Sequence, residues 1–494
     1  MTKFSALFTA SLMALSLAIA SCSPANSAKT TTEASAETPS KASANSAVRT
    51  TAHISKNADI TKAVRADFNY VLGLYEHFHQ NPELSYQEKD SAALMAKEWR
   101  ALGFTVTERI GDTWIKDKIK REFETVPEGV GGYGLIGVMK NGEGPTLMLR
   151  ADMDALPLEE KTGLSYASKV IATDRRGVQA PVMHACAHDS HMAILIGAAR
   201  LLVDNKDKWS GTLILLGQPA EEVGHGAQAM LADGIYEKFP KPDYVLATHT
   251  SGWDKAWDVT YTPGYALANV DSVDIHIKGI GAHGSAPHMG KDPIVIGAQI
   301  INALQTLVSR ETNPLDAGVV TVGAFNAGYK HNIIPDAAHL QLTVRSYEDD
   351  VRQNLIEGIK RIARAQAISA GLPEELYPVV ETESDYTPST FNDPELTARV
   401  MGAVSEQIGE ARVYERPPSM GGEDFSFFHR MDESIPTLIF WTGGTDPDIM
   451  DKAIAGTGPI PPANHSPFFA PNPEAALKTG VEAMTIGAME LLQK

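Results

Sequence analysis

The chain has 494 residues but only two cysteines, Cys22 and Cys186. Cys22 follows a short apolar run, whereas Cys186 lies among histidines in H-A-C-A-H-D, residues 184–189. A disulfide framework is therefore excluded, and if Cys22 is modified then Cys186 has no intrachain partner. A thiol in that position is either buried and inert or bound to a metal.

Dense basic stretches are also absent. The chain has 43 Lys and Arg against 61 Asp and Glu, for a formal net charge of −18. This balance argues against a nucleic acid or an anionic membrane surface as the partner. No repeat of solenoid length is evident. The charge does not identify a substrate.

The N-terminus carries the apolar run, which is too short for a bilayer span, follows Lys3 and ends in small residues. These features are typical of a secretory signal peptide, here residues 1–21. Residues 19–22 resemble the cleavage site of bacterial lipoproteins, which implies lipidation of Cys22. Residues 22–59 are rich in Ser, Thr and Ala and predict a flexible tether. We expect a lipid-anchored protein of the bacterial cell envelope, at the periplasmic face or the outer membrane, with no other membrane contact.

The folded part, expected from about residue 60, is too long for one hydrophobic core and predicts at least two domains. Short β-prone runs alternate with helical patterns, which indicates an α/β fold with a mainly parallel sheet. The predicted strands are residues 146–149, 212–216 and 244–247, and the predicted helices are 90–102, 192–203 and 473–492. Residues 116–132 are charged and glycine-bearing, and we interpret them as a surface insertion.

The pattern changes near residue 270 to the order β-α-β-β-α. This order predicts an antiparallel sheet with two helices on one face, an inserted α+β (ferredoxin-like) domain over residues 268–379. The first domain would then comprise residues 60–267 and 380–494. The predicted elements of the insertion are strands 270–279, 318–324 and 339–346, and helices 293–309 and 351–370.

Metal-binding residue types follow the predicted strands of the first domain, or stand next to its helices. In a parallel sheet the carboxyl ends of the strands meet at one edge, so these side chains should gather there. Taken singly, a cysteine or histidine is more often a packed core residue than a ligand. Together they form the donor set that transition metals demand. The residues are Asp152, Asp154, Cys186, His188, Glu221, Glu222, His249 and His465.

The adjacent pair Glu221 and Glu222 has two readings. Consecutive side chains of an extended segment point in different directions, so one carboxylate can ligate a metal while the other faces a metal-activated water. A solvated acidic turn is the alternative.

Seven motifs in order, covering about residue 60 to the end, resemble the aminoacylase/carboxypeptidase family of co-catalytic metallohydrolases. The similarity is greatest to its amidohydrolase branch of hippurate, N-acyl-amino-acid and auxin-conjugate hydrolases. The motifs are L-R-A-D-M-D-A-L-P (149–157), H-A-C-A-H-D (184–189), G-Q-P-A-E-E (217–222), G-A-H-G-S-A-P-H (281–288), H-N-I-I-P-D (331–336), S-M-G-G-E-D-F (419–425) and N-H-S-P-F-F (464–469).

The resemblance implies a site for two divalent ions, Zn, Mn, Co or Ni, bridged by Cys186. It implies that Glu221 is the general base and that Asp152 and Asp154 orient the ligands. The remaining ligands would be His188, Glu222, His249 and His465.

For the inserted domain, the resemblance implies that it closes over the site and forms a homodimer. His283 and Asn332 would polarise the scissile carbonyl, with the histidine supplied by the partner subunit or by closure. Arg345 would grip a substrate carboxylate, because a guanidinium matches a carboxylate bidentately. Gly421 and Gly422 would bring backbone close to the substrate, or only permit a tight turn.

We therefore expect a metal-dependent amidohydrolase acting on N-acyl amino acids or small peptides with a free carboxylate. A dipeptidase or carboxypeptidase would use the same site. A non-catalytic, lipid-anchored binding protein for acyl amino acids is the third reading, although a binding protein has no need of a base such as Glu221. The chain departs from the family pattern at Ala187, where the branch usually has glycine, and in insertions at 113–130 and 166–180.

Overall fold

The computed structural model describes residues 57–382 and 385–493. The predicted signal peptide, the lipidation site Cys22 and most of the tether lie outside the described residues. Helix α1 (Asn57–Gln80) begins inside the last residues assigned to the tether, so the folded part starts slightly before residue 60. Within residues 57–382 and 385–493, no helix is both long and apolar enough to cross a bilayer.

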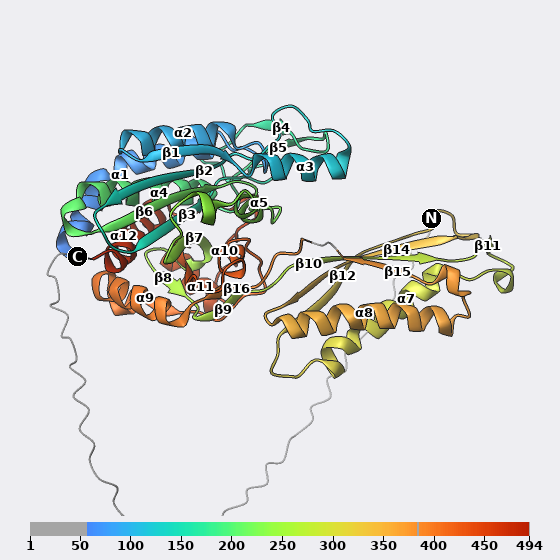
Figure 1. The fold of residues 1–494 in the computed structure, drawn as a ribbon. Coiled ribbons are helices and arrows are strands. Elements are labelled where there is room, and N and C mark those ends of the chain that lie inside the picture. The colour runs from blue at the N-terminus through green and yellow to red at the C-terminus, as the bar shows by residue number, and fades with distance from the viewer. Residues whose placement is uncertain (1–56, 383–384, 494) are drawn as a thin grey trace, which may run out of the picture. The chain divides into compact units, whose positions relative to one another are not determined.

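The first domain is built on an eight-stranded sheet in the order β1-β2-β6-β3-β7-β18-β8-β17. The central strands β6, β3, β7 and β18 are parallel, whereas β1 and β2 pair antiparallel at one side (Figure 1). This confirms the predicted mainly parallel α/β sheet. The bounds are β1 Thr105–Ile110, β2 Gly134–Asn141, β3 Thr146–Asp152, β6 Gly211–Gln218, β7 Tyr244–Lys255, β8 Val259–Tyr261, β17 Val413–Glu415 and β18 Thr437–Thr445.

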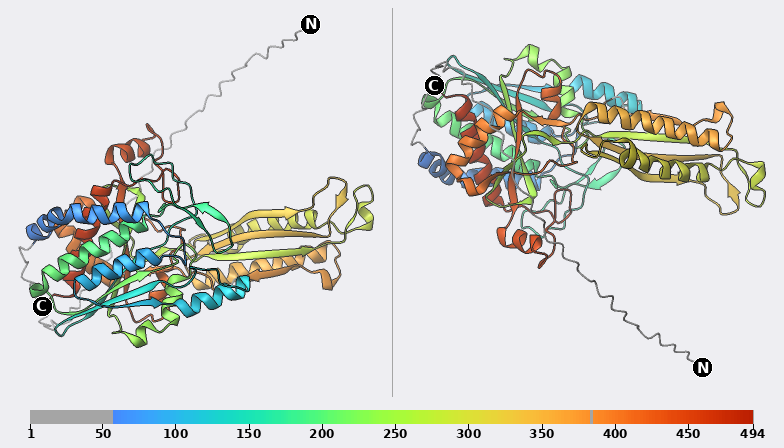
Figure 2. Two further views of the ribbon diagram at one scale, coloured as in Figure 1. Left: turned by 90° about the horizontal axis from the view of Figure 1, so that it is seen from above. Right: turned by 90° about the horizontal axis from the view of Figure 1, so that it is seen from below.

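Helices cover both faces of this sheet because side chains of the buried strands alternate between two cores. Leu147 and Leu149 of β3 pack with α1, α4 and α12 on one face, whereas Met148 packs with α5 and α10 on the other. Figure 2 shows α1, α4 and α12 side by side. On the first face lie α1, α2 (Lys89–Ala101), α4 (His188–Asp204), α9 (Pro394–Ile408) and α12 (Pro473–Leu491), and on the second α5 (Gly226–Ala232), α6 (Ile235–Lys238) and α10 (Ser426–Arg430).

The insertion contains a four-stranded antiparallel sheet in the order β12-β14-β10-β15. Its helices α7 and α8 pack on one face through a core that includes Val273, Ile275 and Ile277, as the β-α-β-β-α pattern predicts. Strand β15 was not predicted. The bounds are β10 Asp271–Lys278, α7 Pro293–Thr306, β12 Gly318–Ala327, β14 Ala337–Ser346, α8 Asp349–Ser369 and β15 Val379–Thr382, with a π turn Leu307–Glu311 and a two-stranded sheet of β11 (Ala282–His283) and β13 (Ile333–Ile334).

The chain passes twice between the first domain and the insertion. Strand β9 (Gly264–Leu267) leads out of the first domain, and β16 (Thr390–Asn392) pairs with it antiparallel on the return. The chain therefore leaves and re-enters at neighbouring points. The remaining elements are the hairpin β4 (Ile171–Thr173) and β5 (Gln179–Pro181), helix α11 (Pro447–Ile454) and the 3-10 turns Lys206–Lys208, Pro287–Met289, Glu374–Leu376 and Glu410–Arg412.

The first part of the surface insertion predicted at residues 116–132 lies in a packed helix, α3 (Asp112–Phe123). Ile115 and Ile119 stand four residues apart on one side of the helix and are fully buried. They pack against a cluster that includes Tyr86 and Ala220, the residue before the paired glutamates. Most of residues 116–132 do lie at the surface, but the prediction missed the helix, because its charged residues occupy the outer face of an amphipathic segment.

Candidate active site

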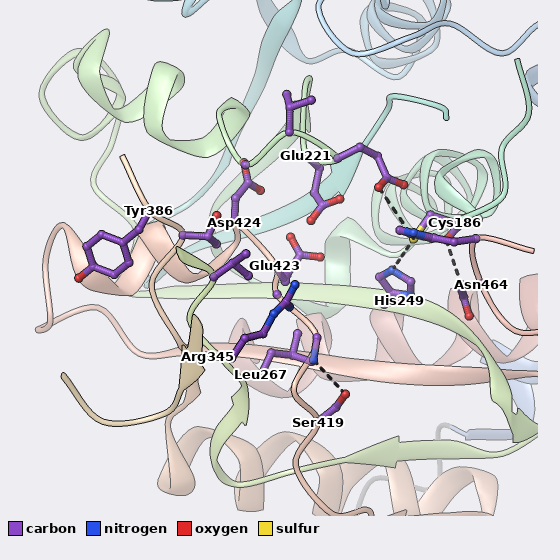
Figure 3. Close-up of a pocket in the computed structure, with 18 of the residues that line it drawn as sticks. Cys186, Glu221, His249, Leu267, Arg345, Tyr386, Ser419, Glu423, Asp424 and Asn464 are labelled. Atoms are coloured by element: carbon purple, nitrogen blue, oxygen red, sulfur yellow. Dashed lines mark hydrogen bonds and ion pairs between the residues drawn. The ribbon is translucent and has the colours of Figure 1, made fainter. Parts of the chain in front are cut away.

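A cavity of about 570 Å³ lies where loops of the first domain meet residues of the insertion. Figure 3 shows Glu221, Cys186 and His249 on one wall and Arg345 on another. Its polar lining has both acidic and cationic groups, and Trp253 and Trp441 add aromatic surface. The lining includes Cys186, Glu221, Glu222, His225, His249, Trp253, Arg345, Asp385, Tyr386, Arg416, Ser419, Gly421, Gly422, Glu423, Asp424, Trp441, Asn464 and His465.

The Cys186 sulfur stands at the centre of the predicted ligands. It lies 3.2 Å from His465 Nε2 and 3.5 Å from His249 Nε2. His465 Nε2 is also 3.5 Å from Glu222 Oε2, and His188 Nε2 is 3.9 Å from Glu222 Oε1. Two donor groups therefore share the thiol: Cys186 with His188 and His249, and Cys186 with Glu222 and His465.

Left-handed backbone positions present these ligands. Ala187, which separates Cys186 from His188 at the start of α4, has φ 73°. Ala220, directly before the paired glutamates, has φ 54°, and His465 itself has φ 67°. Such conformations strain residues with a side chain and cluster at functional sites. The family's usual glycine at the position of Ala187 is thereby explained, because glycine adopts this conformation without strain.

Two carboxylates hold the loop that carries the glutamates. Glu88 accepts a hydrogen bond from the Ala220 amide at 2.8 Å. The two oxygens of Asp154 accept from the amides of Glu221 at 3.0 Å and Glu222 at 3.1 Å. Three consecutive amides are thus fixed. The predicted role of Asp154 beside the ligands acquires a physical basis: it sets the directions of both glutamates.

Asp152 belongs to a second buried network. Its oxygens accept from His191 Nδ1 and from Arg150 Nη1, each at 2.6 Å. Arg150 also donates to Glu423 at 2.8 Å and lies 3.3 Å from Asp424. One arginine therefore joins three buried carboxylates from two distant segments of the chain.

Burial concentrates negative potential around the thiol. Burial, with the carboxylates of Glu222 and Glu221 nearby, raises the pKa of the Cys186 thiol well above its usual range. Burial and the Glu423 charge likewise raise the pKa of Glu221. The pKa of Glu222 rises to about 8 through burial, against the opposing effect of a neighbouring histidine. If the Cys186 thiol and these two carboxyl groups were ionised, they would need cations beside them.

The histidines of the H-A-C-A-H-D segment differ in their partners. Burial opposes protonation of His188, but Asp152 and Asp154 outweigh it and raise its pKa to about 10. Among the described residues, neither ring nitrogen of His188 has a hydrogen-bond partner of good geometry. His191 is satisfied on both sides, because its Nδ1 bonds Asp152 and its Nε2 accepts from the Thr250 amide at 2.8 Å.

Arg345 reaches the cavity from strand β14. Its Nη1 donates to the Met420 carbonyl at 2.9 Å, and its Nε donates to Thr343 Oγ1 at 3.3 Å. Burial lowers its pKa, and no carboxylate among the described residues lies within ion-pair distance. Gly422 is packed so closely that a Cβ there would lie 2.1 Å from the Val270 side chain. Gly422 therefore meets a need for close packing against Val270, whereas a Cβ on Gly421 would make only ordinary contacts at 3.6 Å.

His283 and Asn332 are not brought into this cavity. His283 lies on β11, and Asn332 stands next to β13, where its carbonyl accepts from the Gly284 amide at 2.8 Å. The His283 ring accepts instead from Ser285 Oγ at 2.8 Å. Strand β10 alone, with eight residues, spans about 27 Å between the junction and this tip. Within one subunit these two residues are separate from the other predicted site residues.

Sequence reasoning overlooked several residues of the site. Arg150, Glu423 and Asp424 stand inside the quoted L-R-A-D and G-G-E-D-F motifs, yet their mutual contact depends on the tertiary fold. Asp385 lines the cavity and forms an ion pair with Lys118 of α3 at 2.5 Å. A buried arginine in a run of apolar strand residues was the only available signal, because such a charge requires partners.

Comparison with known proteins agrees with this geometry. The profile of peptidase family M20/M25/M40 matches residues 148–485. Thermostable carboxypeptidase 2 of Saccharolobus solfataricus is 36% identical over 428 residues, covering 86% of this chain and 96% of that protein. A hippurate hydrolase of Campylobacter jejuni is 36% identical over 355 residues, covering 72% of this chain and 83% of that protein.

A solved structure extends the agreement to the fold. The crystal structure of a Bacillus subtilis protein described as a dinuclear metal-binding peptidase of family M20 matches with a TM-score of 0.64 at 26% identity. The match covers 87% of this chain and 99% of that one. The predicted resemblance is thus confirmed: the chain belongs to peptidase family M20/M25/M40 and is a hydrolase.

Proposed function

We propose that this cavity hydrolyses the amide bond of N-acyl amino acids, or of small peptides with a free carboxylate, with two divalent cations. One observation carries the proposal: two donor groups share the Cys186 sulfur, with Glu221 beside them and Arg345, which has no ion-pair partner among the described residues, on another wall. A thiol bridge, a carboxylate base and an anion-binding arginine are the parts that such a reaction requires.

The residues fit two cations. Within the described part of the chain, the two ring nitrogens of His188 and one oxygen of Glu222 are buried without a hydrogen-bond partner. Buried polar atoms without partners are costly, so a cation bound by Glu222 and by one nitrogen of the neutral His188 ring would offset part of that cost. Cys186 would bridge the ions, with His188 and His249 on one side and Glu222 and His465 on the other. Thiolate and imidazole favour zinc, whereas imidazole and carboxylate also accept manganese, cobalt or nickel.

Glu221 is the proposed general base. Bound cations would supply Lewis acidity, lowering the pKa of a water molecule toward neutrality and polarising the scissile carbonyl. Glu221 would take the proton from the attacking water and pass it to the leaving amine as the C–N bond breaks. Asp154 keeps the carboxylate aimed by holding the Glu221 amide. A pKa raised by burial suits a group that must both accept and release the proton.

Arg345 is proposed to bind the carboxylate of the substrate. Its two hydrogen bonds to Met420 and Thr343 fix the guanidinium plane, so little side-chain freedom is lost on binding. Gly421 and Gly422 border the same space, where the absence of side chains would let backbone approach the bound molecule.

The test replaces one glutamate at a time. Glu221→Gln should retain the metal content of the wild type and lose turnover of hippurate-like substrates, whereas Glu222→Gln should lose metal. Full turnover by Glu221→Gln would refute the base assignment. A panel of acyl amino acids and dipeptides, with and without chelator, separates the readings: if nothing is cleaved with any metal, the protein is a binding protein.

A carboxypeptidase or dipeptidase is the second candidate, favoured by the 36% identity to a thermostable carboxypeptidase. It would use the same donors and the same Arg345, and would differ only in the acyl group on the carbonyl side of the scissile amide. Preference for dipeptides over matched acyl amino acids in the same panel would establish it.

A homodimer is proposed to complete the site. His283 and Asn332 lie outside the cavity of their own subunit, so we propose that they act in the cavity of the partner subunit. Chains with Glu221→Gln and chains with His283→Ala should each be inactive, and mixed dimers should regain turnover through one intact cavity. Verified mixed dimers without activity would refute action from the partner subunit.

Anchoring in the cell envelope also stays a proposal, since it depends on Cys22 and the preceding signal peptide. Expression of the full chain in a Gram-negative host should place it in the membrane fraction, and Cys22→Ser should release it from that fraction. Equal amounts of the full chain and of Cys22→Ser in the membrane fraction would refute lipidation.

A further inference from the structure

The open face of the inserted sheet carries a second cluster of metal-binding side chains. On β10, Val273, Ile275 and Ile277 face the helices, so the alternate residues Asp274 and His276 point to the other side. Strand β14 alternates in the same way and presents His339 on that face. Asp274, His276 and His339 therefore share one exposed surface.

Strand register brings these side chains together. His276 is directly paired with His339, and their rings stack with centroids 4.5 Å apart and planes 10° apart. His339 Nε2 lies 2.5 Å from Asp274 Oδ1. From β15, Glu381 brings its Oε2 to 3.5 Å from His276 Nε2. Two imidazoles and two carboxylates thus meet across three strands.

We propose that Asp274, His276 and His339, with Glu381 beside them, bind one divalent transition-metal ion, with zinc the best match. The donor atoms of the first three lie within 4.8 Å of one another. Tetrahedral zinc holds its ligands at about 2.0–2.1 Å, which places ligand atoms about 3.3 Å apart. The rings of His276 and His339 stack with their planes only 10° apart, so they must turn about the Cβ–Cγ bonds until both planes meet at the ion. Two imidazoles favour zinc, nickel or copper over calcium or magnesium.

This site is separate from the catalytic cavity. Arg345 lies on the same face of β14, six residues beyond His339, so about 20 Å of strand separate the two. None of the four side chains lines the cavity. They are accessible to an ion from solvent, since the side-chain exposures are 31% for Asp274 and His339, 44% for His276 and 66% for Glu381.

A bound ion would join β10, β14 and β15. These strands are adjacent in the sheet, with β15 at its edge. Binding to the folded sheet alone stabilises it, because the unfolded chain does not hold the donors together. The site would thus stiffen the edge of the inserted domain without touching the proposed catalytic groups.

The test compares zinc bound per chain after dialysis of the full protein against micromolar free zinc. Wild type should hold one zinc per chain more than His276→Ala/His339→Ala, and His77→Ala, which removes an exposed histidine of α1, should match wild type. Equal zinc in wild type and the double variant would overturn the proposal. Because only the difference is used, the result does not depend on how many ions the cavity holds.

A conservative variant and a local measurement distinguish loss of the zinc site from misfolding of the protein. His339→Gln keeps a polar side chain on the strand and should weaken this zinc site at least about tenfold, since loss of mere supporting contacts already costs about 10–100-fold. Zinc should also slow amide hydrogen exchange in β10, β14 and β15 of wild type but not of this variant. Identical exchange in the two proteins with zinc present would refute the site.

Discussion

Replacement of Arg150 by methionine should destabilise the first domain strongly. The side chain is 1% exposed, and its partners Asp152, Glu423 and Asp424 are 0–3% exposed. Methionine preserves much of the volume but leaves three carboxylates buried without their cation. Removing one partner of a buried ion pair costs about 3–5 kcal/mol. At about 2 °C per kcal/mol for a large domain, the melting temperature should fall by roughly 6–10 °C.

The assay is thermal unfolding of the metal-loaded protein, with Arg100→Met as the matched control. Arg100 pairs with Glu108 on the surface, at side-chain exposures of 49% and 38%. Exposed pairs contribute about 0–1 kcal/mol, so the control should stay within about 2 °C of wild type. Equal melting temperatures for Arg150→Met and Arg100→Met would refute the role of the buried network.

The pH dependence gives a second check. Burial raises the pKa of Asp424 to about 8, and Arg150 opposes that rise. Without the arginine, the folded-state pKa should move further above the unfolded value. A group with a raised folded pKa stabilises the fold below its unfolded pKa, and this contribution is lost as pH rises through the folded value. The loss of folding free energy in Arg150→Met, relative to wild type, should therefore be smaller near pH 6 than near pH 9. A loss that shrinks with rising pH would contradict this account.

Three further predictions concern the site. Arg345→Met should raise KM for substrates with a free carboxylate by about 10–100-fold, the equivalent of one charged hydrogen bond, and should not change KM for the matched carboxamides; equal effects on both would refute carboxylate binding. Ala187→Val should destabilise the fold by at least about 1–2 kcal/mol in urea unfolding, because a β-branched residue tolerates a left-handed backbone poorly. Ala187→Gly should stay within about 1 kcal/mol of wild type, since relief of strain offsets the lost methyl burial. Chelation should lower the melting temperature, and added zinc should restore it, because ions bind the folded donors alone; a melting temperature indifferent to chelator would contradict two bound ions.

Much of the fold was predictable from local pattern. The buried runs of β3, β6 and β7 contain little besides apolar residues, which is what a parallel sheet covered on both faces requires. The inserted domain was predictable because apolar residues recur at every second position in its strands and with the longer helical period in its helices. Helix α3 was missed because the apolar residues that mark its packed side, Ile115 and Ile119 with Trp114 and Phe123 beside them, stand among many charged residues.

The positions of several donors along the chain were likewise open to prediction, because Glu221 and Glu222 follow strand β6 and His188 starts helix α4. The contact of His249 and His465 with a single sulfur, that of Cys186, could not be predicted. Cys186, His249 and His465 are far apart in sequence. The distances of 3.2 and 3.5 Å depend on how the turn before α4, strand β7 and the left-handed His465 pack together. Spacing within a motif carries no information about such contacts.

The sequence by itself determined which chemical groups are present and which sheet edge they follow, since residue identity and periodicity are local properties. Only the tertiary structure decided that Arg150 joins three carboxylates, that Arg345 enters the cavity and His283 does not, and that His276 pairs with His339. These outcomes depend on strand register and on which segments pack together. Register is set by the burial of whole faces, to which every residue of a strand contributes.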